Sequence, residues 1–366
     1  MLGYLRNWFQ RRFSDPNAVT LTLLLVISFA IIMFAGQILA PILVAIALAY
    51  LLEWPVARLQ SVGLGRLYAV LIVFLLFISF ALLLVFFLVP VIWQQGVNLL
   101  SELPLIAQAW RDLMESAEEI APAFIDGSQI QMFTDKVNDR LLQFGQSILE
   151  RSWNTIVLLA VFLVYMIIVP LLVFFMLKDK ALLLSHFSRV LPEQRRLISQ
   201  VGTEMNSQIM NYIRGKSAEI VIVGVVTFIT FSFFDLRYSA LLATLVGLSV
   251  LVPYIGAAVV TIPVALVGLF QFGISPILFW LIFAYLVIQA LDGNVLVPIL
   301  FSEAVSLNPV YIIGAVLIFG GIWGFWGVFF AIPLASLVKA VITALSHQGE
   351  HVDEQPTEPT GADLAE

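Results

Sequence analysis

Long apolar runs alternate with short polar stretches over most of the chain. A helix needs about 20 predominantly apolar residues to cross a bilayer. The runs that meet or approach this length lie at 17–35, 38–53, 68–92, 153–177 and 217–235. Gly36 and Pro41 fall between the first two runs and predict a tight connection there. The pattern therefore predicts a polytopic, all-α membrane protein.

The tract from 238 to 345 is almost wholly apolar, yet Gly and Pro interrupt it repeatedly. It has room for about three full spans or for a larger number of partial ones. Lipid cannot satisfy the backbone groups that Pro and Gly free, so broken segments must face protein or water. The interrupting residues are Pro253, Gly256, Pro298, Pro309, Gly320, Gly321, Gly324, Gly327 and Pro333. We expect broken or re-entrant segments that line a cavity. For Gly320, Gly321 and Gly324 we favour close helix packing, with a helix break as the alternative.

Two stretches of this tract echo each other. Pro253-Tyr-Ile-Gly256 followed by Ile262-Pro263 is similar to Gly324-Phe-Trp-Gly327 followed by Ile332-Pro333. Paired interrupted segments are the best pointer in a sequence to the binding site of a transporter. A chance match in a tract rich in Gly and Pro is the alternative. At Pro253-Tyr-Ile-Gly256 we expect a true helix break.

Apolar residues recur at three- and four-residue steps in two segments between the runs, which predicts an amphipathic helix in each. In the loop 94–152 these residues are Ile130, Phe133, Val137, Leu141, Phe144 and Ile148. In the loop 178–217 they are Leu197, Val201, Met205, Ile209 and Ile213, which lead straight into the next run. We expect both helices to pack on the protein's own membrane domain; contact with another subunit or a position in the membrane plane are the alternatives.

Basic residues gather in alternate loops, and this sets the expected orientation. The segment before residue 17 and the loops 54–67 and 178–217 are rich in Lys and Arg, so we expect them on the cytoplasmic side. The loop 94–152 carries nine acidic and four basic residues and is expected outside. An even number of crossings then places both termini in the cytoplasm. Asp235 and Arg237 are expected in a short outer turn.

These features divide the chain into six expected segments. They are 1–93 (the first three spans, a scaffold), 94–152 (an extracytoplasmic amphipathic helical loop), 153–177 (the fourth span), 178–217 (a cytoplasmic amphipathic helical segment), 218–345 (an interrupted transport core) and 346–366 (a disordered acidic cytoplasmic tail).

Composition strengthens the membrane assignment and limits the chemistry. The 366 residues are 61% hydrophobic and 11% charged, against roughly 45–50% and about 25% in soluble domains. The chain has no Cys, and its three His residues, His186, His347 and His351, lie outside the apolar runs. Thiolate sites and a histidine-dependent site within the membrane are therefore excluded. The phosphate-binding pattern G-x-x-x-x-G-K-[ST] is absent. We expect no enzymatic activity, no cofactor, no bound metal and no nucleic-acid partner.

Asp292 interrupts the middle of the C-terminal tract, in Leu291-Asp-Gly-Asn294. A charge at the centre of a bilayer costs about 2.5–3.5 kcal/mol on insertion scales, so by default it marks a pathway. Asp292 could carry a proton or a cation, or could bind a polar cargo together with Asn294. The alternatives are that Asp292 caps a helix break or lies in an interfacial loop. An aspartyl-protease site is excluded, because such a dyad needs a second carboxylate in a span.

Several motifs carry a resemblance to a known family. The main ones are Leu291-Asp-Gly-Asn-Val-Leu-Val-Pro298, Phe319-Gly-Gly-Ile-Trp-Gly-Phe-Trp-Gly327, Ala331-Ile-Pro-Leu334 and Val252-Pro-Tyr-Ile-Gly256. With these motifs the chain resembles the autoinducer-2 exporter family. The resemblance implies a bacterial inner-membrane protein of about eight spans that assembles as a homo-oligomer, with pentamers known in the family. It implies transport of a small solute without an ATPase subunit.

Three hypotheses for function follow. The favoured one is a secondary transporter or facilitator that exports a small polar solute, for which an autoinducer-2-like molecule is one candidate. Pro253, Gly256, Pro298, Pro309, Asp292 and Asn294 would line its path. The second is a Na⁺(Li⁺)/H⁺ antiporter that uses Asp292, although Asp292 would then act nearly alone. The third is a non-transporting assembly or interaction protein that works through the outer loop. In each case the lipid bilayer surrounds the chain.

Overall fold

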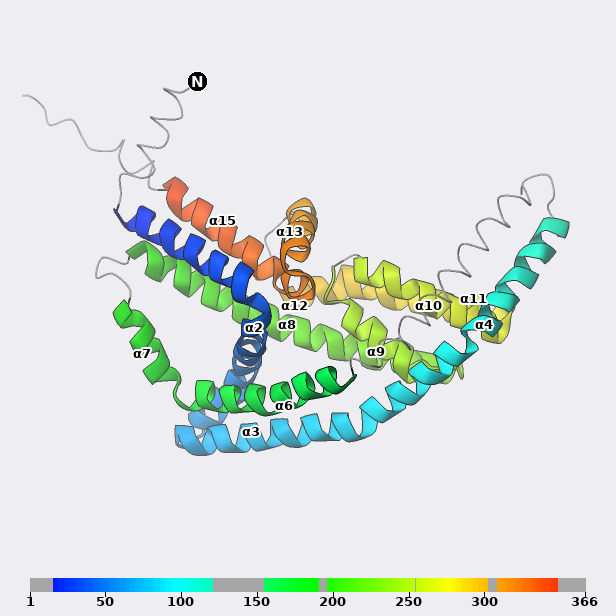
Figure 1. Cartoon of the computed structure of the whole chain (residues 1–366), viewed down its shortest axis with the longest axis horizontal. Coiled ribbons are helices and arrows are strands. Elements are labelled where there is room, and N and C mark those ends of the chain that lie inside the picture. The colour runs from blue at the N-terminus through cyan, green and yellow to red at the C-terminus, as the bar shows by residue number, and fades with distance from the viewer. Residues whose placement is uncertain (1–15, 121–154, 191–195, 254, 302–307, 348–366) are drawn as a thin grey trace, which may run out of the picture. The chain divides into compact units, whose positions relative to one another are not determined.

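The computed structural model describes residues 16–120, 155–190, 196–253, 255–301 and 308–347 (Figure 1). Within these ranges the chain is helical, with short turns and no β-strand. Five helices are long and apolar enough to cross a membrane, or six when the bent pair Phe162–Lys178 and Lys180–His186 counts as one span. The polytopic, all-α prediction is confirmed. Of the expected eight or so spans, the described part of the chain thus holds five to six.

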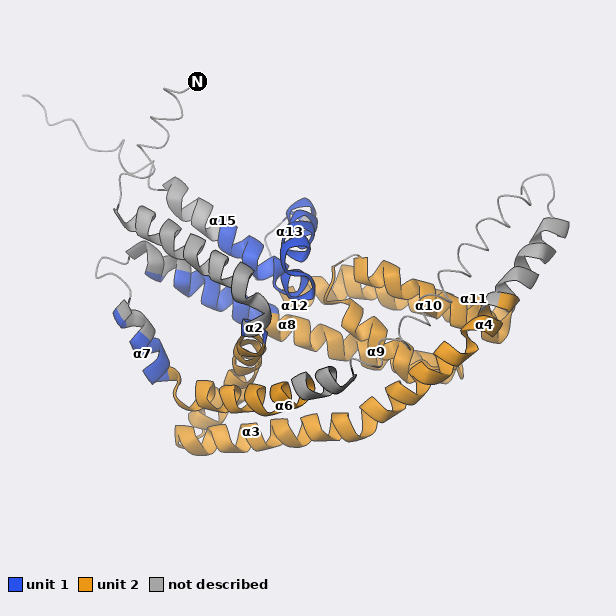
Figure 2. Ribbon diagram, in the orientation of Figure 1, with its two compact units in different colours: residues 1–40, 181–212, 303–366 blue, residues 41–180, 213–302 orange. Residues whose placement is uncertain are grey.

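The described helices form two compact units (Figure 2). Unit 1 comprises the described residues within 1–40, 181–212 and 303–366, and unit 2 those within 41–180 and 213–302. Two long helices contribute to both units: α2 (Pro16–Ser61) and α8 (Arg196–Phe233).

Helix α2 differs from the predicted pair of separate spans. Helix α2 runs through Gly36 and Pro41 without a turn, so the expected tight connection between two spans is wrong. Pro and Gly can lie inside a membrane helix when neighbouring helices, side chains or local adjustments of the backbone satisfy the groups that they free. The side of the membrane on which the N-terminus lies stays a prediction.

Unit 2 contains two hydrophobic cores. The first joins the second half of α2 to α3 (Arg66–Leu83) and α6 (Thr155–Lys178). Its buried residues are Ala45, Leu52, Val56, Ala69, Val70, Val73, Val169, Val173 and Leu177. A π-helical turn, η1 (Leu84–Leu88), continues α3 into α4 (Val89–Ile120). The run expected at 68–92 is therefore one part of a longer apolar helix, Arg66–Ile106.

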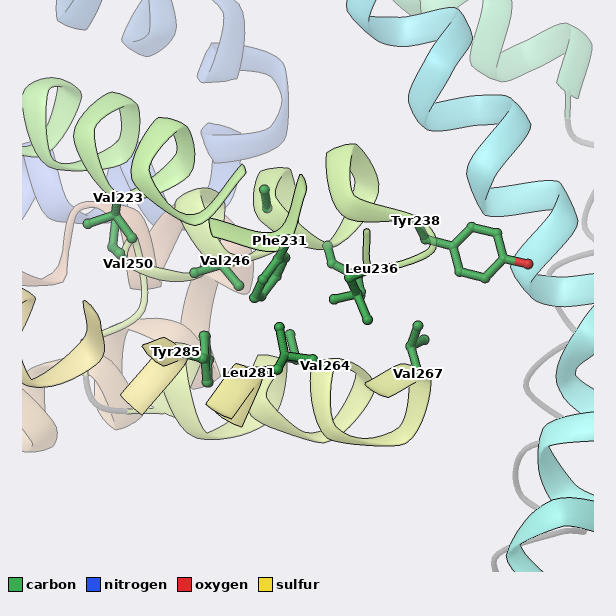
Figure 3. Close-up of a cluster of buried hydrophobic side chains, with 12 residues drawn as sticks. Val223, Phe231, Leu236, Tyr238, Val246, Val250, Val264, Val267, Leu281 and Tyr285 are labelled. Atoms are coloured by element: carbon green, nitrogen blue, oxygen red, sulfur yellow. The ribbon is translucent and has the colours of Figure 1, made fainter. Parts of the chain in front are cut away.

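The second core of unit 2 joins the C-terminal half of α8 to three further helices: α9 (Ser239–Ser249), α10 (Ile255–Phe272) and α11 (Pro276–Leu291) (Figure 3). Phe231, Leu242, Leu281 and Tyr285 are among its most deeply buried side chains. Helices α8 and α9 approach closely at two glycines. A Cβ added to Gly247 would lie only 3.0 Å from the Cα of Gly224 and 2.9 Å from a carbonyl oxygen of α8.

The predicted break at Pro253-Tyr-Ile-Gly256 is confirmed. Helix α9 ends at Ser249 and α10 begins at Ile255, with a turn between them. Gly256 lies directly on the carbonyl oxygen of Ser249, where a Cβ would overlap that oxygen. With only 11 residues, α9 is too short to cross a membrane as a helix.

Unit 1 contains α7 (Lys180–Val190), the first half of α8, α13 (Pro309–Trp323), α14 (Phe325–Phe329) and α15 (Ala331–His347). Gly324 ends α13 with a φ of 62°, a backbone conformation that favours glycine. Gly327 then lies on the carbonyl oxygen of Phe319, where again a Cβ would overlap. The Tyr212 hydroxyl on α8 donates a hydrogen bond to the carbonyl of Phe329 (3.1 Å).

The two sequence echoes thus adopt related local structures. In each, a short apolar helix ends, the chain turns, and a glycine (Gly256 or Gly327) packs on a carbonyl of the preceding helix. Gly320 also packs closely, because a Cβ there would lie 2.8 Å from the side chain of Val328, whereas Gly321 has no neighbour within 4 Å.

The predicted amphipathic segments differ in outcome. The stripe from Leu197 to Ile213 lies on α8, which continues unbroken to Phe233, and Met205 and Ile213 are buried. This confirms the predicted helix. The stripe from Ile130 to Ile148 and the tail from 348 onward lie outside the described residues.

Candidate transport site

Asp292 lies in the middle of a membrane-spanning helix, Pro276–Phe301. Helix α11 begins with Ser275, whose hydroxyl accepts from the backbone N–H of Leu278, and with Pro276 in the first turn. It continues into a π-helical turn, η3 (Asp292–Leu296), and then into α12 (Val297–Phe301). The π turn inserts one extra residue into a helix, and such turns are frequent at functional sites. Asn294 stabilises this one, because its side-chain amide donates to the carbonyl of Ala290 (2.8 Å).

The capping alternative for Asp292 is wrong. Its backbone is helical (φ −58°, ψ −58°) and the helix continues through it, so Asp292 does not begin a helix. Its Oδ1 atom is buried and has no hydrogen-bond partner among the described residues. A buried carboxylate oxygen without a partner is costly, which indicates a role other than support of the backbone.

An ion pair on α8 forms the second part of the site. Lys216 Nζ donates to both carboxylate oxygens of Glu219, at 2.8 and 3.0 Å. The two side chains are 8% and 2% exposed. They lie three residues apart, which places them on one face of the helix. The Lys216 ammonium also lies 5.5 Å from the ring centroid of Phe301, at the end of α12. Gly215 permits this approach, since a Cβ there would lie 2.7 Å from the same ring.

The buried ion pair and the half-buried Asp292 form one charge cluster. Both Lys216 and Glu219 interact electrostatically with Asp292. With all three side chains ionised, the cluster holds two carboxylates and one ammonium and carries a formal charge of −1. In a medium of low dielectric constant, such an excess attracts a cation, a proton or a hydrogen-bond donor.

Further polar groups continue from the charge cluster along the same helices. On α11, Tyr285, Gln289 and Asp292 lie at four- and three-residue steps and so share one face. Gln289 Nε2, and Thr227 Oγ1 on α8, are buried without a hydrogen-bond partner among the described residues. The Tyr285 hydroxyl lies 3.0 Å from Thr261 Oγ1 on α10. Unpaired donors and acceptors therefore lie on both α8 and α11, where a polar molecule or water could satisfy them.

Comparison with known proteins decides the family. Residues 21–347 match the family model described as "AI-2E family transporter". The chain belongs to the AI-2E transporter family. It is 53% identical over 345 residues to "Putative permease PerM" of Escherichia coli strain K12, covering 94% of this chain and 98% of that one. It is 25% identical over 303 residues to "Putative transport protein YrrI" of Bacillus subtilis, covering 82% and 85%. A "Putative transport protein" of Thermotoga maritima is 24% identical over 334 residues, covering 90% and 95%. The family resemblance read from the motifs is confirmed.

The predicted site residues of this AI-2E family transporter fall in both units. Asp292 is the one that belongs to the charge cluster. Asn294 is exposed and turns its amide back onto its own helix, and Pro298 is exposed on α12. Pro253 lies in the turn between α9 and α10, and Gly256 lies in the first turn of α10. The remaining residues, all in unit 1, are Pro309, Gly320, Gly321, Gly324, Gly327 and Pro333. Pro309 follows the N-cap residue Asn308, and Pro333 lies buried in the first turn of α15.

Sequence reasoning missed Lys216 and Glu219. From the sequence, Lys216 is one of the loop cations and Asp292 stands nearly alone, whereas in the structure Glu219 lies within electrostatic range of Asp292. The available signal was the spacing Lys216-x-x-Glu219 immediately before the apolar run that begins at Ile220. Opposite charges at this spacing favour an ion pair on one helix face.

A second polar cluster of the transporter ties α4 to the turn between α8 and α9. Arg237 lies 3.5 Å from Glu102 of α4, and Gln271 of α10 bonds the backbone of both Asp235 and Arg237. Asp235 and Arg237 are both exposed in this turn, as expected, and they do not form a buried ion pair with each other. Burial and the Glu102 carboxylate raise the pKa of Tyr238 to about 12. Among the described residues, no group of three or more His, Asp and Glu side chains could hold a metal ion.

Proposed function

We propose that the chain is a secondary transporter that exports a small polar solute across the bacterial inner membrane, with an autoinducer-2-like molecule as one candidate cargo. The observation that carries the proposal is the cluster of the buried Lys216–Glu219 ion pair with the half-buried Asp292, in otherwise apolar helices long enough to span a membrane. Charges inside a membrane are expensive and mark the paths of ions or substrates. The printed names of the relatives, which call them permease or transport proteins, agree with this function.

In this proposal the solute replaces hydrogen bonds that the protein leaves unmade. Its donor groups bind Asp292 Oδ1 and its acceptor groups bind Gln289 Nε2, while a hydroxyl bonds Thr227. The Lys216–Glu219 pair keeps most of the cluster's charge balanced, so the site does not hold its cargo too tightly. The π turn at Asp292 gives α11 and α12 a place at which their relative rotation changes during transport.

Orientation and assembly are part of the same proposal. The basic loops at 54–67 and 178–217 support a cytoplasmic position for both. With an even number of crossings, both termini then lie in the cytoplasm. The family resemblance supports a homo-oligomer, for which we propose five subunits. A protease-protection assay on inverted membrane vesicles and native mass spectrometry test these two points separately.

The test of the transport site uses purified protein in proteoliposomes. Uptake of labelled autoinducer-2 and of other small polar solutes is compared between the wild type, Asp292→Asn and the matched control Asp235→Asn, which changes an exposed turn. A hydrogen bond to a charged group contributes about 1.5–3 kcal/mol, so Asp292→Asn is expected to reduce flux of the correct cargo by roughly 10- to 100-fold. Equal flux in the two variants, with both correctly folded, would contradict a role for Asp292 in the path.

A second candidate function is Na⁺(Li⁺)/H⁺ antiport, and the position of Glu219 beside Asp292 favours it. Two carboxylates that share one ammonium form a site at which a proton and a small cation can compete. In vesicles with an inward-acidic pH gradient, addition of Na⁺ or Li⁺ should then collapse the gradient, and Asp292→Asn and Glu219→Gln should each abolish the response. Uncoupled solute export predicts no such response in the wild type.

A further inference from the structure

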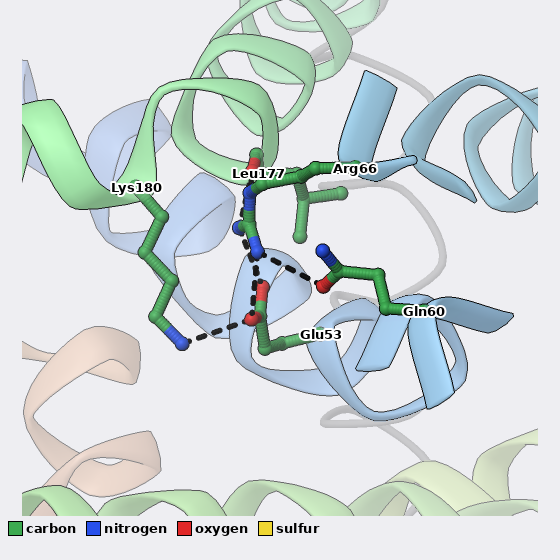
Figure 4. Close-up of polar contacts among 5 residues, drawn as sticks. All are labelled: Glu53, Gln60, Arg66, Leu177 and Lys180. Carbon is green, nitrogen blue, oxygen red and sulfur yellow. Dashed lines mark hydrogen bonds and ion pairs between the residues drawn. The ribbon is translucent and has the colours of Figure 1, made fainter. Parts of the chain in front are cut away.

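The ends of three membrane-spanning helices meet in unit 2, far along the chain from the charge cluster (Figure 4). Arg66, at the start of α3, donates to the carbonyl of Leu177 at the end of α6 (Nε to O, 3.0 Å) and lies 3.3 Å from Glu53 near the end of α2. Lys180 lies 2.9 Å from the same carboxylate. Because direct contacts join the three helix ends, these ends lie at the same membrane boundary.

Cations outnumber carboxylates around this junction. The four basic residues are Arg58, Arg66, Lys178 and Lys180, and the two acidic ones are Glu53 and Asp179, an excess of two positive charges. Glu53 serves both Arg66 and Lys180. Asp179 lies 3.9 Å from Lys178, with both side chains more than a third exposed. Arg58 has no carboxylate partner among the described ion pairs.

Two of these basic side chains, Arg58 and Lys178, each lie over an exposed aromatic ring. The Arg58 guanidinium lies 5.6 Å from the ring centroid of Trp54, which is 53% exposed. The Lys178 ammonium lies 5.8 Å from the ring of Phe175, which is 45% exposed. Trp at the end of a membrane span sits at the level of the lipid headgroups, and long basic side chains reach the same depth. These two pairs, Trp54 with Arg58 and Phe175 with Lys178, are together called the basic rim.

We propose that the basic rim binds the headgroups of anionic phospholipids. The lipid phosphate accepts from Arg58 on one flank of the junction and from Lys178 on the other, and the first carbons of the acyl chains pack beside Trp54 and Phe175. Charge complementarity favours this occupant. The junction carries an excess of two positive charges, and Arg58 has no carboxylate partner among the described ion pairs, at the depth where an anionic bilayer presents its phosphates. Bound lipid would hold the ends of α2, α3 and α6 together in addition to the Arg66 and Lys180 contacts.

The experiment titrates the purified full-length protein in neutral detergent with phosphatidylglycerol or with phosphatidylcholine of the same acyl chains. Native mass spectrometry counts the lipids bound, and thermal unfolding follows their effect on stability. Phosphatidylglycerol is expected to bind more tightly, by roughly five-fold for each cation involved, and salt should weaken the preference. In Arg58→Ala/Lys178→Ala the preference should disappear. The matched variant Arg58→Lys/Lys178→Arg keeps both charges and should retain it.

Three outcomes would overturn the proposal. Phosphatidylcholine could bind as tightly as phosphatidylglycerol, or the double alanine variant could keep the preference for the anionic lipid. Glycerol phosphate, added without acyl chains, could give the same stabilisation at the same concentration, which would identify a free phosphate site instead. If the double variant does not fold, the single variant Arg58→Gln is tested instead. It should lower the preference for phosphatidylglycerol by roughly five-fold, the contribution of one cation. None of these residues belongs to the transport site, so this result is independent of the flux measurements.

Discussion

The Lys216 ammonium lies 2.8 Å from a carboxylate oxygen of Glu219 inside unit 2, and Asp292 of another helix lies within electrostatic range of both. Lys216 and Asp292 stand 76 positions apart in the chain (292 − 216). In the proposed function, this proximity puts the transport site between α8 and the π turn that follows α11. It also makes the stability of the fold depend on a small number of buried charges.

Removing one member of the buried ion pair should destabilise the protein strongly. Glu219→Gln leaves Lys216 without its carboxylate, and the loss of one partner of a buried pair costs about 3–5 kcal/mol. Replacing both, as in Lys216→Met/Glu219→Leu, should cost much less, because apolar side chains leave no buried charge. Denaturant unfolding in detergent measures both. A Glu219→Gln variant as stable as the wild type would show that the pair is hydrated in the folded protein.

The two helix-turn glycines should tolerate no side chain. In Gly256→Ala and Gly327→Ala the new Cβ overlaps a backbone carbonyl that cannot move away easily, so each should lose about 1–3 kcal/mol or more. Gly96→Ala, in α4, is the matched control, because nothing lies within 4 Å of its added Cβ; there Ala should gain up to about 1 kcal/mol of helix propensity. Thermal unfolding that ranks the control with the other two would contradict the close packing.

Tyr238 should make stability depend on pH in the alkaline range. Its pKa is raised to about 12 by burial and by the neighbouring Glu102 carboxylate, against about 10 in an unfolded chain. Because the folded value is the higher one, its contribution is complete below about pH 10 and is lost as the pH rises through 12. Tyr238→Phe should remove this part of the pH dependence. Unfolding curves collected from pH 9 to 12 test it, and identical slopes for both proteins would disprove it.

Substitutions of Asn294 and Asp292 should have different effects, the first on stability and the second on transport. The Asn294 amide satisfies a carbonyl of its own helix at an exposed position, so Asn294→Ala should cost about 1 kcal/mol of stability and leave flux per folded protein unchanged. Asp292→Asn, in the cluster, should lower flux with a smaller change in stability. Flux and thermal unfolding measured on the same preparations distinguish the two. If Asn294→Ala lost as much flux as Asp292→Asn, Asn294 would have to contribute to the transport path as well.

Part of this architecture follows from local sequence alone. Apolar runs of spanning length predict helices in a membrane, since a helix is the structure that satisfies its own backbone in lipid. The break at Pro253-Tyr-Ile-Gly256 is also local, because Pro lacks an N–H donor and Gly accepts close backbone contact. Asp292 stands out for the same reason: one carboxylate within an apolar tract is visible without any knowledge of its neighbours.

Other features depended on how the helices pack. Pro41 could end a helix or lie within one, and in the folded chain it lies within α2. Lys216 reads as one more loop cation until the fold buries it beside Glu219 and brings Asp292 to both. Electrostatic energy depends on distance through space and on burial, and neither is encoded in positions along the chain. The apolar runs thus predict the membrane helices, whereas the packing of these helices determines which charged side chains lie close together.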